Sequence, residues 1–313
     1  MCKAGFSNKY GFPILVIGLL CAAGIHPQAP SLTDALRRIQ SLDFCGEPIP
    51  LESEEVWERF EKEFMLILWD RPQILLYLKR MPRTMPLIEK ILRDAGLPDD
   101  LKYMAVVESA LRPHAESSRG AVGFWQFTES TGVKYGLEIN EFVDERRNVV
   151  RSTEAAAKYL QALEDTLGSW TLAAAAYNMG EYGLVREIEN QGVTDYYRLY
   201  LPLETQRFVL RIAAVKTILS DPEAYGFFVS RREAYPIRSA EQVTVVLDRS
   251  VPTRLIALAA GADFKEIKDL NPELRGYDMP SGERSILIPR GSRKQFHERL
   301  DRLIFEQRNF SIE

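Results

Sequence analysis

One carboxylate stands on a helical face that is otherwise apolar. In residues 98–108 the apolar side chains Leu101, Met104 and Ala105 recur at helical spacing, and Glu108 takes the next position on that face. A carboxylate in the place of a hydrophobe costs free energy unless it is paired or protonated. Burial raises the pKa of a carboxyl group, and such a group can act as a general acid near neutral pH. Glu108 is therefore the first catalytic candidate, with a structural bond to an arginine or to a helix N-terminus as the alternative.

A loop with glycines and aromatic residues follows Glu108. Gly120 and Gly123 allow a positive φ or a close approach of the backbone. Trp125, Gln126 and Phe127 come directly after them. An aromatic face beside an amide suits a sugar, because the CH face of the ring packs on the aromatic side chain while hydroxyl or N-acetyl groups take directed hydrogen bonds. The loop as a whole indicates a saccharide site, but for either Trp125 or Phe127 taken alone a place in the core is favoured.

Two further polar clusters lie at predicted helix ends. Tyr177 and Asn178 close an alanine-rich stretch just before Gly180, where a hydroxyl and an amide can point into a cleft. An Asn-x-Gly sequence is also an ordinary helix stop. Glu204 and Thr205 precede the next apolar stretch, and either residue alone could simply cap a helix.

The composition limits the chemistry available to the chain. With 313 residues, 46% of them hydrophobic, the chain can bury a large core and form two domains. A net charge of −4 argues against a strongly basic surface for nucleic acid. Histidine and cysteine occur only three times each, far apart, so no spacing resembles a metal site and no cofactor is indicated. Catalysis must then rest on carboxylates, hydroxyls and amides.

The N-terminus has the pattern of an export signal. Lys3 and Lys9 precede an apolar run at 12–25, which a polar, proline-containing stretch at 26–30 follows. The apolar run is short for a membrane span, although an uncleaved anchor remains the alternative. The sequence therefore predicts a signal peptide at 1–25 and an exported protein of the periplasm or cell envelope.

A cysteine inside this segment raises the question of lipid attachment. Leu20 precedes Cys21, whereas a lipidation motif requires a small residue there, so plain secretion is favoured. Cleavage after Gly24 would leave Cys45 as the single cysteine. No intramolecular disulfide could then form, and stability would have to come from packing.

Periodicity and breakers divide the rest into a helical part and a small mixed part. Helices are predicted at 51–69, 73–79, 86–94, 98–110, 152–167, 170–177 and 205–219. Ser152 or Thr153 is the expected N-cap of the fifth helix. Beyond Tyr235 the composition changes, and a compact β-α-α-β unit with a helical tail is predicted, with strands at 243–247 and 285–288 and helices at 252–260, 264–270 and 293–308.

Taken together, the three clusters resemble the lytic transglycosylases of the goose-type-lysozyme-like superfamily, particularly those of the membrane-bound D type. The resemblance covers residues 97–219, and residues 45–79 are also similar to the family. Phe124-Trp125 departs mildly from the family pattern, as does Asn148, where an Asp is expected. The matching motifs, in the family's order, are Glu108-Ser109, Gly120-Ala121-Val122-Gly123, Gln126, Ala176-Tyr177-Asn178 and Glu204-Thr205.

This resemblance implies a mainly α fold. A lysozyme-like transglycosylase domain would carry an N-terminal helical extension and a small C-terminal unit. The expected boundaries are a signal peptide at 1–25, the extension at 45–95, the catalytic domain at 96–225, the C-terminal β-α-α-β unit at 240–291 and a final helix at 292–313.

The resemblance also implies a mechanism with one carboxylate. Glu108 would protonate the oxygen between N-acetylmuramic acid and N-acetylglucosamine, then accept the proton of the muramoyl C6 hydroxyl, which closes a 1,6-anhydro ring. No metal or cofactor takes part. The residues that match the family's substrate-binding positions are Ser117, Gln126, Tyr177, Asn178 and Glu204.

The C-terminal unit resembles a LysM module, a type that binds N-acetylglucosamine-containing glycans. Residues 269–272 and 286–289 carry the likeness, while the first strand and Val251-Pro252 depart from it. Glycan binding and a purely structural role both remain open, because a fold does not establish a site. The implied partners are peptidoglycan glycan strands, with membrane attachment through the N-terminus as a further option and no nucleic acid.

Two other functions compete with a transglycosylase. A hydrolytic muramidase on the same fold would need a carboxylate such as Glu129 or Asp144 to hold water. A non-catalytic cell-wall protein is expected to lack Glu108 or the pair Tyr177 and Asn178, all of which are present.

Overall fold

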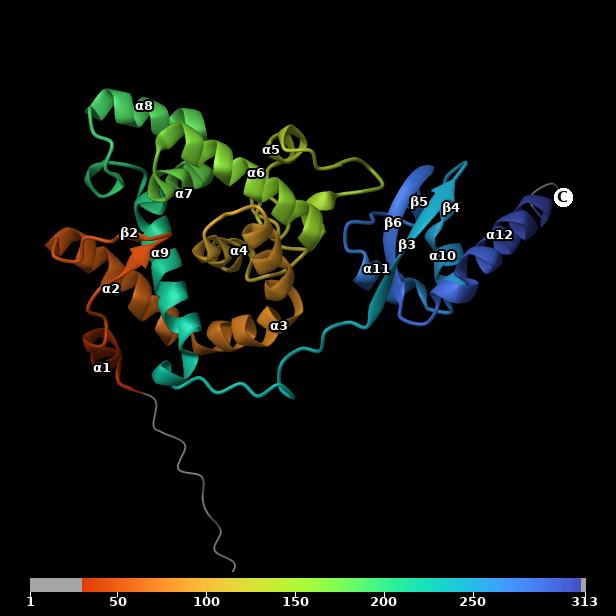
Figure 1. Ribbon diagram of the computed structural model, residues 1–313, viewed down its shortest axis with the longest axis horizontal. Helices are drawn as coiled ribbons and strands as arrows, with labels where there is room; N and C mark the ends of the chain where they lie inside the picture. The colour runs from red at the N-terminus through yellow and green to blue at the C-terminus, as the bar shows by residue number, and fades with distance from the viewer. Residues whose placement is uncertain (1–29, 311–313) are drawn as a thin grey trace, which may run out of the picture.

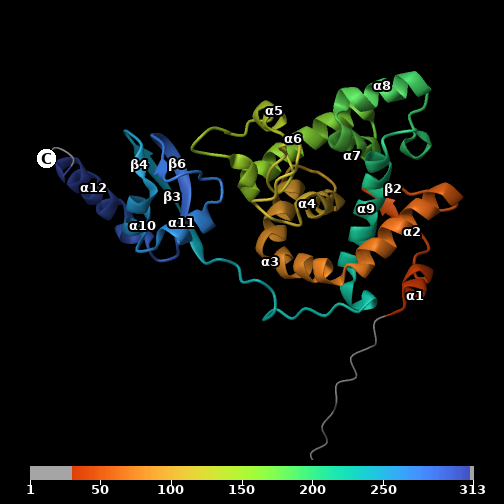
Figure 2. The same ribbon diagram turned by 180° about the vertical axis from the view of Figure 1, so that it is seen from behind.

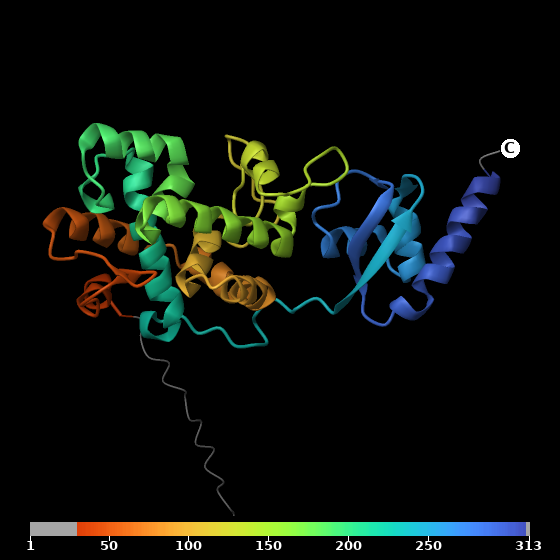
Figure 3. The same cartoon turned by 45° about the horizontal axis from the view of Figure 1, so that its top comes forward.

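The computed structural model describes residues 30–310. A helical body and a smaller unit with strands lie side by side, and the segment 226–239 runs from one to the other (Figure 1). The same arrangement is visible from behind (Figure 2) and with the top of the molecule tilted forward (Figure 3). A mainly α fold with a small C-terminal β-α-α-β unit is therefore confirmed. The predicted signal peptide lies outside the described residues.

The helical body extends from α1 to η4. Its elements are α1 (Leu32–Arg37), β1 (Asp43–Phe44), β2 (Glu47–Pro48), α2 (Glu54–Trp69), α3 (Arg71–Asp94), η1 (Asp99–Leu101), α4 (Lys102–Ser109), α5 (Glu129–Lys134), η2 (Glu145–Arg147), α6 (Val149–Leu167), α7 (Trp170–Met179), α8 (Glu181–Gln191), η3 (Tyr196–Arg198), α9 (Leu203–Ser220) and η4 (Pro222–Tyr225). None of the helices within residues 30–310 is long and apolar enough to cross a membrane.

Helix α9 is the central packing element of this body. It contacts α2, α4 and α7, and most of its side chains are buried. The alanines at 173–176 of α7 are fully buried, which allows neighbouring backbones to approach closely. A single hydrophobic core runs from Ala35 to Phe227, so α1, α2 and α3 share it with α4 and with α6 to α9. The separate boundaries of an N-terminal extension and a catalytic domain stay a prediction.

Helix α3 is longer than the sequence predicts. It is continuous across Pro82 and Pro86, where a break was expected. Burial of Met85, Ile88 and Leu92 against α4 and α6 stabilises the helix enough to offset the backbone hydrogen bonds that the prolines remove.

Helix α6 begins earlier than predicted and has a different cap. Asn148 Oδ1 accepts hydrogen bonds from the backbone N–H groups of Val150 and Arg151. Ser152 and Thr153 lie inside the helix and are fully buried, with their hydroxyls donating to the carbonyls four residues earlier. The prediction that either residue caps α6 is wrong, because Asn148 offers the better-placed acceptor.

The C-terminal unit contains the predicted elements and one additional strand pair. Its elements are β3 (Ala240–Leu247), β4 (Val251–Pro252), α10 (Thr253–Ala260), α11 (Phe264–Leu270), β5 (Asp278–Met279), β6 (Gly282–Pro289) and α12 (Arg293–Phe310). Strand β3 pairs antiparallel with β6, with Val243 opposite Ile286, and β4 pairs with β5. Alternate side chains of β3 face the core, and Phe296 and Leu300 of α12 complete it against α10.

The two units are joined by a short antiparallel contact. The backbone N–H of Asp144 donates to the carbonyl of Glu273 at 2.8 Å, and that of Arg275 donates to the carbonyl of Phe142 at 2.7 Å. Between them Val143 and Leu274 form a β-bridge and are both buried in the C-terminal core.

Candidate active site

Glu108 lies in the last turn of α4, close along the chain to the buried residues Leu101, Met104 and Ala105. Ala110 caps the C-terminal end of the helix with a φ of 54°, and the next residue, Leu111, also has a positive φ, of 57°. These two residues turn the chain sharply into the glycine-containing loop. Glu108 is half-buried, and no hydrogen bond or ion pair to its carboxylate occurs within residues 30–310. The alternative of a structural Glu bonded to an arginine is therefore not realised in the described part of the chain.

The surroundings of Glu108 favour its protonated form. Burial and, to a smaller degree, the Glu204 carboxylate raise the pKa of Glu108 to about 8, while the Arg211 guanidinium opposes them. Glu204 itself is exposed in the first turn of α9, and its hydrogen bond to Arg211 lowers its pKa. The two carboxyl groups therefore have opposite tendencies, one to hold a proton and the other to stay ionised.

A network of charges fixes Glu204. Arg211 Nη1 donates to Glu204 Oε1 at 2.7 Å, while Arg211 Nε donates to Glu63 Oε2 at 2.9 Å. Glu63 also accepts a hydrogen bond from Arg207 and is only 2% exposed. Glu63, Arg207 and Arg211 were not predicted as site residues, since the partners lie 144 and 148 residues apart and no local pattern connects them.

Tyr177 and Asn178, at the end of α7, form hydrogen bonds with the loop after α4 and with α9. The Tyr177 hydroxyl donates to the carbonyl of Trp125 at 2.6 Å, and the Thr205 hydroxyl donates to Asn178 Oδ1 at 2.9 Å. Burial raises the pKa of Tyr177, and the nearby Glu108 carboxylate adds to this effect. The structure thus brings the three sequence clusters together: the loop after α4, the end of α7 and the start of α9.

The loop aromatic residues have a structural role. Trp125 is fully buried and its Nε1 donates to Thr153 Oγ1 at 2.9 Å, and Phe127 is 2% exposed. The expectation that each of these aromatic residues belongs to the core is therefore confirmed. Trp125 is bonded to Thr153 of α6, tyrosines of α6 and α7 contact Phe127, and neither ring offers its face to a sugar.

The polar residues of the loop remain nearer the surface. Gln126 has a φ of 50°, and its Nε2 donates to the carbonyls of Ala115 and Gly123. Its Oε1 accepts no hydrogen bond from the described residues, which leaves that oxygen free for a ligand. Ser117 is exposed, and its Oγ accepts hydrogen bonds from the backbone of Arg119 and Ala121.

A buried ion pair between Asp144 and Arg146 stabilises the same loop through hydrogen bonds to its backbone. Arg146 binds Asp144 through two hydrogen bonds of 2.8 and 2.9 Å, and both residues are buried. The Arg146 Nη1 atom also donates to the carbonyls of Gly120 and Phe127, each at 3.2 Å. Asp144 is thus bound to Arg146 and only 1% exposed, so its carboxylate is not available to hold a water molecule beside Glu108.

The close approach of η2 to the loop requires glycine at position 123. Gly123 has a φ of +84°, and a Cβ at this residue would lie 1.8 Å from the Arg146 carbonyl oxygen. We expect Gly123→Ala to lower the free energy of unfolding by about 3 kcal/mol or more, since backbone strain and a backbone clash add. Urea denaturation measures this change.

Gly136 supplies the matched control for that substitution. Its φ is +90°, yet a Cβ at this residue would meet no atom within 4 Å, so Gly136→Ala tests the cost of the positive φ alone. That cost is about 1–2 kcal/mol. Equal losses for the two variants would show that the contact with Arg146 contributes nothing.

Comparisons with known proteins agree with this arrangement. Residues 85–199 match the family described as transglycosylase SLT domain, and residues 241–303 match the LysM-like domain of lytic transglycosylase MltD. The chain is 33% identical over 211 residues to the membrane-bound lytic murein transglycosylase D of Escherichia coli K12, covering 66% of this chain and 46% of that protein. The protein of the same name from E. coli O6:H1 matches equally. The chain thus spans about half the length of these curated relatives.

Solved structures give weaker matches. The 70 kDa soluble lytic transglycosylase of E. coli aligns with a TM-score of 0.38 at 20% identity, over 48% of this chain and 26% of that one. An inactive mutant of the lytic transglycosylase Slt of Pseudomonas aeruginosa aligns with a TM-score of 0.34 at 17% identity, over 49% and 26%. By the two domain matches, residues 85–199 belong to the transglycosylase SLT domain family and residues 241–303 to the LysM-like domain family of lytic transglycosylase MltD.

Proposed function

We propose that this protein is a peptidoglycan lytic transglycosylase. It cleaves the β-1,4 bond between N-acetylmuramic acid and N-acetylglucosamine without water and leaves a 1,6-anhydro end. The observation that carries the proposal is the position of Glu108. Its carboxyl group lies half-buried where the three clusters meet, has no hydrogen-bond partner within the described residues and has a raised pKa. The SLT domain match at 85–199 supports it.

In this mechanism Glu108 acts twice. The protonated carboxyl group first donates its proton to the glycosidic oxygen, so that the bond to C1 of the muramic acid breaks. The carboxylate then accepts the proton of the C6 hydroxyl, which attacks C1 from within the same sugar. Because the nucleophile belongs to the substrate, the reaction gains from proximity and needs no second carboxylate to activate water.

The other polar residues would position the substrate. We assign Tyr177 and Asn178 to the N-acetyl group, whose carbonyl can stabilise the positive charge at C1, since both residues lie at the end of α7 beside Glu108. Gln126 has a free amide oxygen for a sugar N–H or hydroxyl. Ser117 and Glu204 are exposed on either side, in the loop and on α9.

A hydrolytic muramidase is the second candidate. It would need a carboxylate to hold the attacking water. Asp144 is poorly suited because it is buried against Arg146. Glu129 is exposed in the first turn of α5 and is therefore the remaining candidate for this role. A non-catalytic cell-wall protein is less consistent with the raised pKa of Glu108, because strongly shifted pKa values are concentrated at functional sites.

The products separate these functions. Purified peptidoglycan is digested with the protein and the released fragments are identified by mass spectrometry. Anhydro-muropeptides as the main product support the transglycosylase, while reducing ends from the same bond support a muramidase. If nothing is released, the chain is a binding protein.

The raised pKa of Glu108 predicts the pH dependence of the reaction. The first step requires the protonated acid, so kcat/KM is expected to fall as pH rises through about 8, where Glu108 loses its proton. Turnover of a soluble muropeptide dimer across this range measures the alkaline limb. A limb near the ordinary carboxyl pKa would contradict the proposed state of Glu108.

We further propose an exported protein of the cell envelope that binds peptidoglycan glycan strands. The curated relatives are described as membrane-bound, and an N-terminal attachment of this chain is the corresponding expectation. In the C-terminal unit, the Asn271 side chain donates hydrogen bonds to the carbonyls of Ile267 and Leu287 and accepts one from the N–H of Leu287. These bonds favour a structural role for this residue. Fractionation of cells separates a membrane-attached form from a free periplasmic one.

A further inference from the structure

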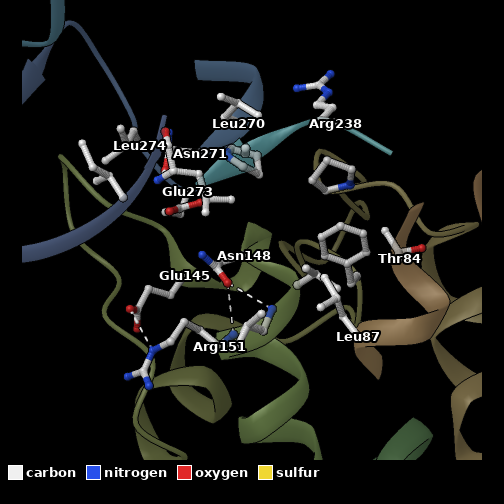
Figure 4. A pocket seen from close by; sticks show the side chains of 18 of the residues that line it. Thr84, Leu87, Glu145, Asn148, Arg151, Arg238, Leu270, Asn271, Glu273 and Leu274 are labelled. Atoms are coloured by element: carbon white, nitrogen blue, oxygen red, sulfur yellow. Dashed lines mark hydrogen bonds and ion pairs between the residues drawn. The ribbon is translucent and has the colours of Figure 1, made fainter. Parts of the chain in front are cut away.

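A large cavity lies between the helical body and the C-terminal unit. Its volume is about 820 Å³, and its walls come from α3, from the segments 111–113 and 148–151, and from the segment 269–274 (Figure 4). Glu108 does not line it, although Leu111 to Pro113 connect the two places along the chain. The contact between residues 142–144 and 273–275 closes one side. The cavity is thus separate from the candidate active site but adjoins the same loop.

Three side chains that line the cavity carry buried polar atoms without a partner. Glu273 Oε2, Thr84 Oγ1 and Arg284 Nε have no hydrogen-bond partner within the described residues. Glu273 is 7% exposed and Thr84 is 6% exposed. Figure 4 shows the Asn148 side chain next to that of Glu273, with Thr84 on the opposite wall. Buried polar groups that lack a partner cost free energy, and a bound ligand that supplies the partner recovers it.

The negative side of the cavity is defined by Glu273. Burial raises the pKa of Glu273, the nearby Glu145 carboxylate adds to this, and the Asn148 amide opposes it. No ion pair to Glu273 occurs within residues 30–310. A ligand cation placed beside it would stabilise the ionised carboxylate.

The opposite side is positive. Arg80, Arg83 and Arg112 line the cavity and donate only to backbone carbonyls, at 3.1, 3.2 and 3.1 Å, with no carboxylate partner in the described part of the chain. Burial lowers the pKa of Arg83, and the positive charge of Arg238 lowers it further. Arg238 has one carboxylate partner, Asp269, at 3.4 Å. Uncompensated guanidinium groups at this density favour a carboxylate or phosphate ligand.

The combination of charges selects the class of ligand. A neutral sugar prefers aromatic faces and uncharged hydrogen-bond partners, whereas here cations and an anion face one space from opposite sides. The apolar side chains between them, among them Leu87, Leu111 and Leu274, suit a short aliphatic chain. A molecule that carries carboxylates, a free amine and short aliphatic segments matches all three features.

We propose that the cavity between the two units binds a zwitterionic oligopeptide, with its carboxylates on the arginines of α3 and its free amine on Glu273. Given the proposed function, on which this identification rests, the peptide is the stem of peptidoglycan, which carries carboxylates and the amine of a diamino acid. The protein then holds the glycan at Glu108 and recognises the peptide at a second place.

Calorimetric titration of the full chain with synthetic stem peptide tests the proposal. The probe is N-acetyl-L-Ala-γ-D-Glu-meso-diaminopimelyl-D-Ala, in which the diaminopimelyl amine is the single free amine. It is compared with the same peptide acetylated on that amine and with a form whose carboxylates are amidated. We expect Glu273→Gln to weaken binding of the peptide with the free amine by about tenfold and to leave the peptide without it unaffected. Arg83→Gln is expected to weaken both of these peptides by about tenfold but not the amidated one.

Matched variants and a glycan probe complete the experiment. Glu266→Gln and Arg254→Gln change exposed residues of the same charges outside the cavity and are expected to bind like the wild type. Equal affinities for the cavity variants and these controls would overturn the proposal, as would the absence of peptide binding at millimolar concentration. So would loss of chitotetraose binding, rather than peptide binding, in Glu273→Gln.

The titration is independent of bond cleavage. It is carried out in the Glu108→Gln background with a peptide that has no glycosidic bond, so the peptide affinity is measured whether or not the protein produces anhydro ends. A protein that binds the peptide and releases no fragment refutes the proposed activity alone. A protein that releases anhydro fragments and ignores the peptide refutes the cavity proposal alone.

Discussion

Glu108→Gln is expected to lower kcat/KM by about 10³-fold while the fold is retained. The amide has nearly the same shape as the carboxyl group but can neither donate a proton to the glycosidic oxygen nor accept one from the C6 hydroxyl, and general acid–base catalysis is worth about 10²–10⁴-fold. Neither Glu204 nor Asp144 stands ready to replace it, because Glu204 is bound to Arg211 and Asp144 to Arg146. Release of anhydro-muropeptides measures the loss.

The same variant has a second signature in stability. The pKa of Glu108 is about 8 in the folded protein against an ordinary value of 4.5, so its contribution to stability is complete below pH 4.5 and is lost as pH rises through about 8. Gln at this position does not titrate. As pH rises between these values, we therefore expect the free energy of unfolding of the variant to increase relative to that of the wild type by on the order of 2 kcal/mol. The difference is limited to this size because solvent partly screens the half-buried carboxylate. Near wild-type turnover by a folded variant would refute the role of Glu108.

Glu63→Gln is expected to reduce both stability and activity at high pH. Glu63 is nearly fully buried between Arg207 and Arg211, and breaking a buried ion pair costs about 3–5 kcal/mol. In the wild type two carboxylates, Glu63 and Glu204, balance two guanidinium groups. Removing one carboxylate leaves an excess positive charge near Glu108, which lowers the pKa of that acid. The alkaline limb of kcat/KM should then move to lower pH.

Two variants on α2 separate a positioning role from a merely structural one. Glu58→Gln removes an exposed charge and is expected to change neither property. Glu63→Asp keeps the charge with a shorter side chain, and is expected to restore the pH limb more completely than the stability. If Glu63→Gln is destabilised yet keeps the wild-type limb, Glu63 supports the fold alone. The limb is measured by turnover of soluble muropeptide at matched protein concentrations.

The sequence predicts best where the deciding interactions are local. Glu108 could be singled out because its neighbours on one helical face set the pattern within a few turns, and the structure leaves it without a partner among the described residues. The positive φ of Gly120 and Gly123 follows from the residue type in the same way. Strands β3 and β6 were also predicted, but the predicted ranges are shorter than the observed strands, because the residues at the strand ends do not continue the apolar pattern.

Interactions between distant segments were not predictable. Whether Trp125 faces a ligand or the core depends on α6, whose Thr153 accepts the indole hydrogen bond. The partners of Arg211 come from α2 and from α9 itself, and only the folded chain places Glu63 beside them. Proline normally ends a helix, yet α3 continues past Pro82 because tertiary packing outweighs the local preference.

The antiparallel contact at Val143 has a consequence for how this protein can be divided. Val143 and Phe142 lie within the SLT domain match at 85–199, but they pack into the core of the C-terminal unit. A cut at the connecting segment 226–239 would therefore expose apolar surface on both products, and each would carry an open strand edge where residues 142–144 and 273–275 had paired. Exchanging one unit for a foreign module would therefore require a new partner for residues 142–144 or for residues 273–275.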